Sequence, residues 1–130
     1  MISAKDAVAD LHRRFGQSSR TGSPNQDDVA RWTERSVEAE IDFYNEVAAE
    51  LARGYAEQRY SFTFCDTVVN GCFGTLVAGQ MRRPQPPWPM LFQRVYEAFD
   101  AGEYHRRPDK SDDPEAEHTA PLIATIVKEL

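Results

Sequence analysis

The 130-residue sequence contains no long apolar run and no excess of positive charge. Its longest mostly apolar stretch, Val68 to Met81, is interrupted by polar residues and falls short of the roughly 20 residues that a transmembrane helix needs. The first residues lack the basic and then apolar order of a secretory signal, so we expect a cytoplasmic protein. Fifteen basic and twenty-one acidic residues give a net charge of −6, which argues against nucleic acid as a partner. We therefore expect a soluble acidic protein that binds neither a membrane nor nucleic acid.

Cysteine is scarce, with only Cys65 and Cys72 in the chain. In a helix, this spacing would place the two residues about 10 Å apart along the axis, and a disulfide needs Cα atoms closer than about 7 Å. The spacing also differs from the CxxC pattern of redox and zinc sites. We interpret both residues as small buried side chains in a reducing compartment.

Apolar and polar residues do not alternate with a period of two over any useful length, so strands are not expected. Apolar residues at a spacing of three to four predict five helices, over residues 3–15, 25–55, 62–78, 89–101 and 119–130. Turn-forming residues and prolines separate them and predict a flexible linker at 17–26, a stiff proline-rich crossover at 81–89 and a polar loop at 103–118.

The predicted fold class is all-α, with residues 1–130 forming a single domain. We expect a compact bundle of four main helices plus the short N-terminal helix, which the linker leaves as a peripheral arm. The proline-rich crossover joins the helices at 62–78 and 89–101. The helix at 62–78 is apolar on one side and has small residues on the other, which places it at the centre of the bundle.

Two acidic residues, Glu40 and Asp66, fall on the apolar sides of their predicted helices, and Asn70 follows Asp66 by one turn. A carboxylate in apolar surroundings must be protonated, paired or placed in a cleft. Glu40, Asp66 and Asn70 are therefore the candidate catalytic residues, as a general acid/base pair or a cation site. The alternative is structural: Glu40 meets an arginine, a tyrosine hydroxyl or a backbone amide, and Asp66 lies near a helix start.

Four residues, Glu34, Glu38, Asp66 and Asn70, resemble in their placement the magnesium ligands that all-α nucleotide pyrophosphatases carry on neighbouring helices. The resemblance implies a small metal-dependent hydrolase, although the predicted 62–78 helix offers Asp66 as its only acid. The polar loop at 103–118 lacks the central glycine and terminal glutamate of an EF-hand, so we interpret it as a solvated loop. We predict no cofactor and no metal ligands, with a divalent cation as the alternative.

The outer face of the predicted 25–55 helix carries an acidic ridge, formed by Glu34, Glu38, Asp42, Glu46 and Glu50. Such a ridge can steer a basic protein into contact, so we predict it as the partner-binding surface. The alternative is a solvated face that only keeps the protein soluble.

Three function hypotheses follow. In size, charge and lack of a catalytic signature the chain resembles bacterial immunity and antitoxin-type proteins, so the first hypothesis is a non-catalytic protein-binding or regulatory module. The second is the metal-dependent hydrolase using Glu40 and Asp66. The third is a self-associating structural bundle, a homo-oligomer with Trp32, Phe43 or Phe92 at the contact.

Overall fold

The structure, a computed structural model, describes residues 2–82 and 85–130 and is all-helical. Helices account for 71% of the chain, and the described ranges contain no strand. In chain order the helices are α1 (Ala4–Gln17), α2 (Gln26–Trp32), α3 (Val37–Ala56), α4 (Phe62–Gly79), α5 (Met90–Asp100) and α6 (Ala120–Glu129). A 3-10 turn (Ser19–Gly22) follows α1, and a π-helical turn (Glu115–Thr119) leads into α6. The all-α prediction is confirmed.

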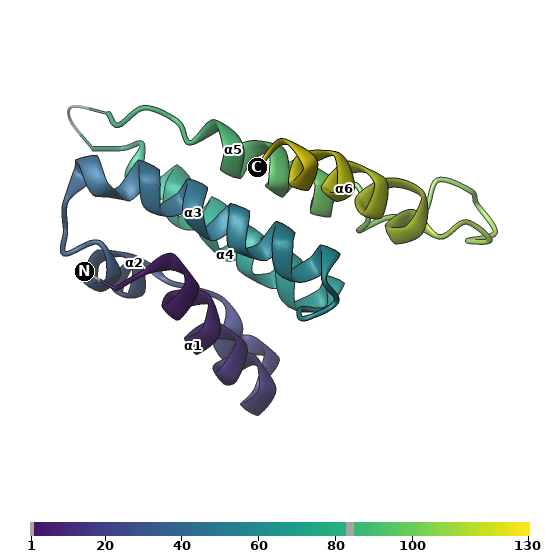
Figure 1. The fold of residues 1–130 in the computed structure, drawn as a ribbon, viewed down its shortest axis with the longest axis horizontal. Coiled ribbons are helices and arrows are strands. Elements are labelled where there is room, and N and C mark those ends of the chain that lie inside the picture. Colours follow the sequence, from purple (N-terminus) through teal and green to yellow (C-terminus); the bar gives the residue numbers. More distant parts are fainter. Residues whose placement is uncertain (1, 83–84) are drawn as a thin grey trace.

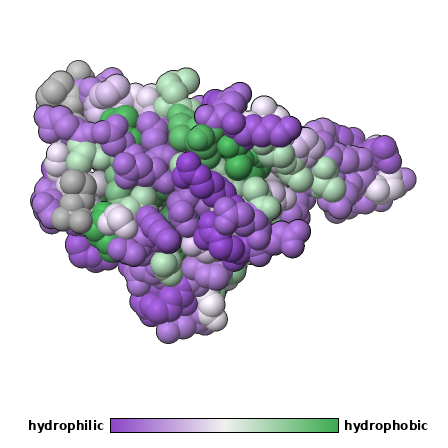
Figure 2. All heavy atoms as spheres, in the orientation of Figure 1, coloured by the Kyte–Doolittle hydropathy of each residue, from purple (hydrophilic) through white to green (hydrophobic). Residues whose placement is uncertain are grey.

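The helices form three layers (Figure 1), with α3 and α4 between α1 and α2 on one side and α5 and α6 on the other. α3 contacts α1, α4, α5 and α6. Side chains from these elements fill one continuous core, including Leu11, Tyr44, Val68, Phe92 and Ile123. The face seen in Figure 2 is mostly hydrophilic, with a hydrophobic area near α5 and α6. In the part of the chain that is described, no helix combines the length and apolar character needed to cross a lipid bilayer.

The single helix predicted over 25–55 is wrong, because the chain turns between α2 and α3. Glu34 and Arg35 adopt left-handed φ angles of 53° and 61°. Before them, the Thr33 hydroxyl donates to a carbonyl oxygen one turn back at 2.8 Å. After them, the Ser36 hydroxyl oxygen accepts a hydrogen bond from the Ala39 amide in the first turn of α3, at 3.2 Å, and so caps that helix. The apolar spacing on both sides of the turn fits one helix, so periodicity alone could not reveal the break.

The segment expected to be a flexible linker, 17–26, packs against α1 and α4 in the structure. It approaches α4 closely at Gly71, where an added Cβ would lie 2.3 Å from the Ser23 hydroxyl oxygen. α1 belongs to the core and is not a peripheral arm, because its apolar side is buried at Ala7, Val8 and Leu11. The ion pair of Arg14 with Asp28, at 3.0 Å, joins α1 to the start of α2.

The predicted helices 62–78 and 89–101 agree with α4 and α5 to within a residue. α4 is enclosed on three sides only, because Thr63, Asn70, Gly74 and Val77 form an exposed stripe along it. The final helix differs at its start: Thr119, the first residue of the predicted 119–130 helix, already has helical backbone angles, and its hydroxyl donates to the Ala98 carbonyl oxygen at 2.7 Å. Helical structure therefore begins earlier, within the predicted polar loop.

Several side chains assigned from sequence to particular surroundings can now be placed. Cys65 and Cys72 are buried and free, as predicted. Trp32, Phe43 and Phe92 all belong to the core, with at most 4% of each exposed, so they are not available for contact between copies of the chain. In the crossover, residues 83 and 84 lie outside the described part of the chain; beyond them, Trp88 packs edge-on against Phe73.

Candidate functional site

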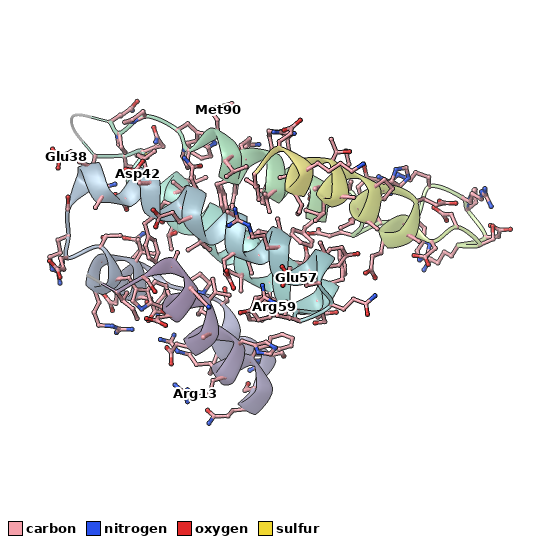
Figure 3. All side chains as sticks on the ribbon, viewed as in Figure 1. Arg13, Glu38, Asp42, Glu57, Arg59 and Met90 are labelled. Atoms are coloured by element: carbon pink, nitrogen blue, oxygen red, sulfur yellow. The ribbon has the colours of Figure 1, made fainter. Side chains whose placement is uncertain are left out.

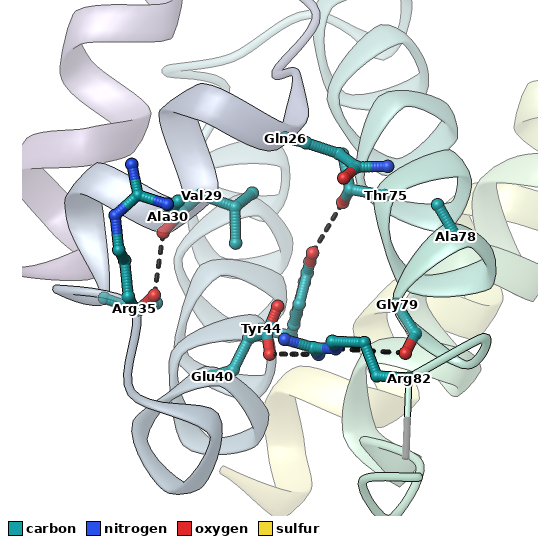
Figure 4. Close-up of a pocket in the computed structure, with 11 residues that line it drawn as sticks. Gln26, Val29, Ala30, Arg35, Glu40, Tyr44, Thr75, Ala78, Gly79 and Arg82 are labelled. Carbon is teal, nitrogen blue, oxygen red and sulfur yellow. Dashed lines mark hydrogen bonds and ion pairs between the residues drawn. The ribbon is translucent and has the colours of Figure 1, made fainter. Parts of the chain in front are cut away.

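A cavity of about 230 Å³ lies between α2, the first half of α3 and the end of α4 (Figure 4). Its apolar lining includes Val29, Ala30 and Ala78, and its polar lining includes Gln26, Arg35, Glu40, Tyr44, Thr75 and Arg82. The cavity thus contains Glu40, one of the candidate catalytic residues. It also borders the turn between α2 and α3, which contributes Arg35.

Two hydroxyl groups meet inside this cavity. Tyr44 Oη lies 2.5 Å from Thr75 Oγ1, and Thr75 Oγ1 donates to the Cys72 carbonyl oxygen at 2.8 Å. Since that bond uses the hydroxyl proton of Thr75, Tyr44 is the donor in the first one. Tyr44 is fully buried, and burial raises the pKa of its phenol above the ordinary value. The phenol is therefore neutral, and its oxygen can still accept a hydrogen bond.

Glu40 is held by an ion pair across the cavity. Arg82 Nη2 donates to Glu40 Oε2 at 2.5 Å, and Arg82 Nε donates to the Gly79 carbonyl oxygen at 3.1 Å. The side chain of Glu40 is 13% exposed and that of Arg82 is 43% exposed, so the pair is partly solvated and contributes at most about 1 kcal/mol to stability. The structure thus shows the arginine partner that the structural alternative for Glu40 requires. Arg82 follows the end of α4, where the spacing of residues along a helix no longer predicts in which direction a side chain points.

Asp66 lies at the other end of α4, beside the end of α5. Its Oδ1 atom is buried and has no hydrogen-bond partner among the described residues. The Asn70 amide donates to the Asp66 backbone carbonyl and to Glu103 Oε2, both at 2.9 Å. Burial, then hydrogen bonding to and repulsion by Glu103, raise the pKa of Asp66 to about 8, with a smaller contribution from Asp100. A neutral Asp66 that donates its proton to Glu103 avoids the repulsion between two carboxylates.

The structure does not bring Glu40 and Asp66 together. Glu40 faces the part of α4 near Gly79, thirteen residues beyond Asp66, which corresponds to about 20 Å along the helix axis. Glu34 and Glu38 lie at the same end of α3 as Glu40, so the ligand arrangement that resembles nucleotide pyrophosphatases is not formed. Within residues 2–82 and 85–130, no cluster of three or more His, Cys, Asp or Glu side chains could hold a metal ion.

The predicted acidic ridge is shortened in the structure to three residues, Glu38, Asp42 and Glu46, which we call the acidic face of α3. All three are exposed and follow each other by one helical turn (Figure 3 labels the first two). Glu50, in contrast, is paired with Arg59 at 3.2 Å, and its side chain is largely buried. Glu34 lies in the left-handed turn before α3 and so leaves the helical register.

The polar loop at 103–118 is organised around Asp112, a buried acid that sequence reasoning did not single out. Its Oδ2 accepts the Arg106 backbone amide at 2.8 Å, and its Oδ1 lies 3.2 Å from Nδ1 of His105. The hydrogen bond from the Arg106 amide is the main cause that lowers the pKa of Asp112 to about 2. Asp112 therefore serves as an internal anchor of the loop.

A second, more open cavity of about 710 Å³ lies between the end of α3, the start of α4 and α6. The Tyr55 hydroxyl donates to Glu115 Oε2 there at 2.7 Å, and the ring of Tyr60 stacks near the guanidinium of Arg59. Tyr55 and Glu115 thus satisfy each other, and Arg59 is ion-paired with Glu50 and Glu57.

Comparison with protein-family models, with curated proteins and with solved structures found no match to this chain. The arrangement of the residues described above is therefore the only basis for assigning a function.

Proposed function

We propose that the protein is a non-catalytic binding module of the cytoplasm that binds a basic protein at the acidic face of α3. The observation that carries this proposal is the division of the acids on α3. Glu40 and Glu50 are paired with arginines of this chain. Asp42 and Glu46 form no ion pair with any described residue, and Glu38 only accepts a 3.4 Å hydrogen bond from the Ser36 hydroxyl.

The spacing of the acidic face suits a regular basic surface. Residues one helical turn apart have Cβ atoms about 5–6 Å apart, so the three carboxylates form a row along the helix. Lysine or arginine side chains at a similar spacing on one helix of a partner can face all three. The net charge of −6 attracts such a partner at long range and raises the rate of association at low ionic strength.

An exposed apolar side chain lies at the start of α5, the helix that packs beside α3. The backbone amide of Phe92 donates to Asn45 Oδ1 at 3.1 Å, which fixes the start of α5 beside the middle of the acidic face. Met90 lies in this first turn of α5 and is 65% exposed. Figure 3 shows Met90 at the start of α5, on the side of that helix away from α3. A methionine among charged residues supplies apolar contact area at the edge of a polar interface.

The proposal is tested by reversing the acidic face to lysine (E38K, D42K, E46K) and measuring binding to a purified partner. The partner is first captured on the wild-type protein from an extract of the native host, then identified and purified. We expect calorimetric binding that weakens with added salt and falls at least about a hundredfold in the reversed variant, since three like charges now face the basic surface.

The matched control reverses three exposed acids on other elements, Asp6, Asp27 and Glu117. It changes the net charge equally, so it separates the acidic face from a general effect of charge. Equal losses in both variants, or a captured partner that binds the reversed variant as well as wild type, would contradict the proposal. Melting curves of both variants establish that they remain folded.

The geometry gives less support to a metal-dependent hydrolase, because Glu40, on α3, faces the end of α4, whereas Asp66 lies near the start of α4. Each also has a neighbour that accounts for its position, Arg82 for the first and Glu103 for the second. A binding module does not require Glu40 and Asp66 to lie close together.

A further inference from the structure

The outer side of α3 carries a positive charge near its end. Arg53 follows Glu46 by seven residues, which is close to two helical turns, so it lies on the same side of α3 as the acidic face. Arg53 is exposed, as Asp42 and Glu46 are. Ala49, which lies between Glu46 and Arg53 on this side, is small and buried. The outer side of α3 therefore presents three acids in its first half and one arginine in its last turn.

Arg53 has no partner within the described part of the chain. On a helix, an arginine pairs with acids three or four residues away, which for Arg53 are Glu50 and Glu57. Both acids are paired with Arg59 instead, Glu50 at 3.2 Å and Glu57 at 2.9 Å, and Figure 3 shows Arg59 beside Glu57. Arg59 reaches them because the chain turns back after α3, at Gln58 with its left-handed φ of 62°. The guanidinium of Arg53 thus remains available to a partner.

The charge of Arg53 limits which basic segments fit along α3. A helix that carries lysine or arginine along its whole length places one of them against Arg53, about 10 Å beyond Glu46 along the axis. Like charges in contact weaken binding, whereas an acid at that point forms an ion pair. Arg53 therefore selects a partner whose row of bases ends in an acid and disfavours a segment that is basic throughout.

The same charge pattern sets the direction of the partner helix. The helix dipole favours acids near the start of a helix and bases near its end. α3 itself follows this order, with Glu38 and Glu40 in its first turn and Arg53 in its last. A partner helix whose acid faces Arg53 and whose bases face the acidic face follows the same order only when it runs antiparallel to α3. Both dipoles are then matched by the charges of their own helix.

We propose that Arg53 determines the specificity of the acidic face, and that the partner segment is a helix antiparallel to α3 with one acid near its start and three bases after it. The bases follow the acid by seven, eleven and fifteen residues, which are the spacings from Arg53 back to Glu46, Asp42 and Glu38. This inference rests on the proposed function, because it takes the acidic face as the binding surface.

The proposal is tested with two synthetic helical peptides of about 20 residues, long enough for an alanine-rich sequence to form a helix. The first has one glutamate and three lysines at the spacings given above, on a background of alanine and glutamine. The second has lysine in place of the glutamate. Each is titrated into the full protein at low ionic strength, and the backbone amides are followed by NMR.

We expect both peptides to shift the amides of Asp42 and Glu46 saturably. For the first peptide we expect a Kd on the order of 1 mM, because exposed ion pairs are weak. The wild type should bind the first peptide about fivefold more tightly than the second, since the second replaces an attraction at Arg53 by a repulsion. A nitroxide at the N-terminus of the first peptide should broaden the amides around Arg53 more than those around Glu38, which lies about 22 Å away along α3.

Two variants assign the selectivity to Arg53. Arg53→Glu should reverse the preference, so that the second peptide binds about fivefold more tightly than the first. Arg20→Glu is the matched control, because Arg20 is also exposed and has no ion pair with the described residues, but lies in the turn after α1. It changes the net charge equally and should keep the preference of the wild type.

Four outcomes would overturn the proposal: no saturable shift with either peptide, equal binding of both peptides to the wild type, an unchanged preference in Arg53→Glu, or stronger broadening around Glu38 than around Arg53. If Arg53→Glu fails to fold, the two peptides and the nitroxide still decide the question on the wild type. Failure of the proposed function is distinguishable, because the reversed variant (E38K, D42K, E46K) tests that function on the captured partner. Loss of that partner without selectivity at Arg53 would refute this inference alone.

Discussion

Replacing Asp66 by Asn is expected to stabilise the protein at alkaline pH and to leave it nearly unchanged at acidic pH. The carboxyl has an ordinary pKa of 3.8 and a pKa of about 8 in the folded protein. The native state therefore keeps a proton that the unfolded chain releases above about pH 4. The free energy of unfolding falls as the pH rises from about 4 to about 8, and the stability that the proton provides is lost above that range. Asn cannot ionise, and its amide can donate to Glu103 as the neutral carboxyl does.

The size of the expected stabilisation follows from the difference between the two pKa values of Asp66, 3.8 and about 8. At about 1.4 kcal/mol per pKa unit, the rise sets an upper limit of about 6 kcal/mol on the stability lost by about pH 9. Asp66 is only half-buried, and water screens its repulsion with Glu103, so we expect about 2 kcal/mol. In a chain of this length that difference corresponds to a change in Tm of about 8 °C.

Urea unfolding of wild type and D66N at about pH 5 and about pH 9 measures the difference directly. The wild type should lose stability between the two pH values by about 2 kcal/mol more than D66N does. E103Q removes the same repulsion and should give a similar gain, and the gains of D66N and E103Q should not add in the double variant. An identical pH dependence in wild type and D66N would refute the reasoning.

Three further predictions concern the packing of the bundle and are checked by urea or thermal unfolding. Gly71→Ala should destabilise the protein by about 1–3 kcal/mol, because the added Cβ meets the packed segment after α1. Gly74→Ala is the control: an added Cβ there has nothing within 4 Å, so the change should be neutral or stabilise by up to about 1 kcal/mol. Equal effects of the two variants would contradict the close approach at Gly71. Tyr44→Phe should cost about 1 kcal/mol through the lost hydrogen bond, and an unchanged midpoint would argue against that bond. Asp28→Ala should lower the free energy of unfolding by about 3 kcal/mol, because it removes the capping box of α2 and leaves Arg14 without its buried partner. A free energy of unfolding unchanged within experimental error would show that this network contributes little.

The positions of most helices could be predicted from sequence because their apolar residues recur on one side over several turns. The turn between α2 and α3 could not, since Thr33 and Ser36 are short polar residues that also occur within helices. The left-handed angles of Glu34 and Arg35 have no signature in residue type, because neither is glycine or asparagine. One signal was available, as Ser36 precedes two acids in the first turn of α3 and serine is a favoured cap.

The candidate site was predicted in part. The position of Glu40 and Asp66 among apolar residues correctly marked both as acids in unusual surroundings, since Glu40 lines a cavity and the pKa of Asp66 is raised. Their partners could not be predicted, because Arg82 and Glu103 follow the ends of helices and reach their contacts through the tertiary packing. The relative position of the two acids likewise depends on which ends of α3 and α4 face each other.

The central claim is that the acidic face of α3 is the binding surface. Its most direct test is zero-length carbodiimide cross-linking of the protein to its purified basic partner, followed by mass spectrometry. This reagent joins a carboxylate to a lysine only where the two are in contact. We predict that the cross-links fall on Glu38, Asp42 and Glu46. Cross-links confined to the acids of the 103–118 loop, or spread evenly over the surface, would contradict it.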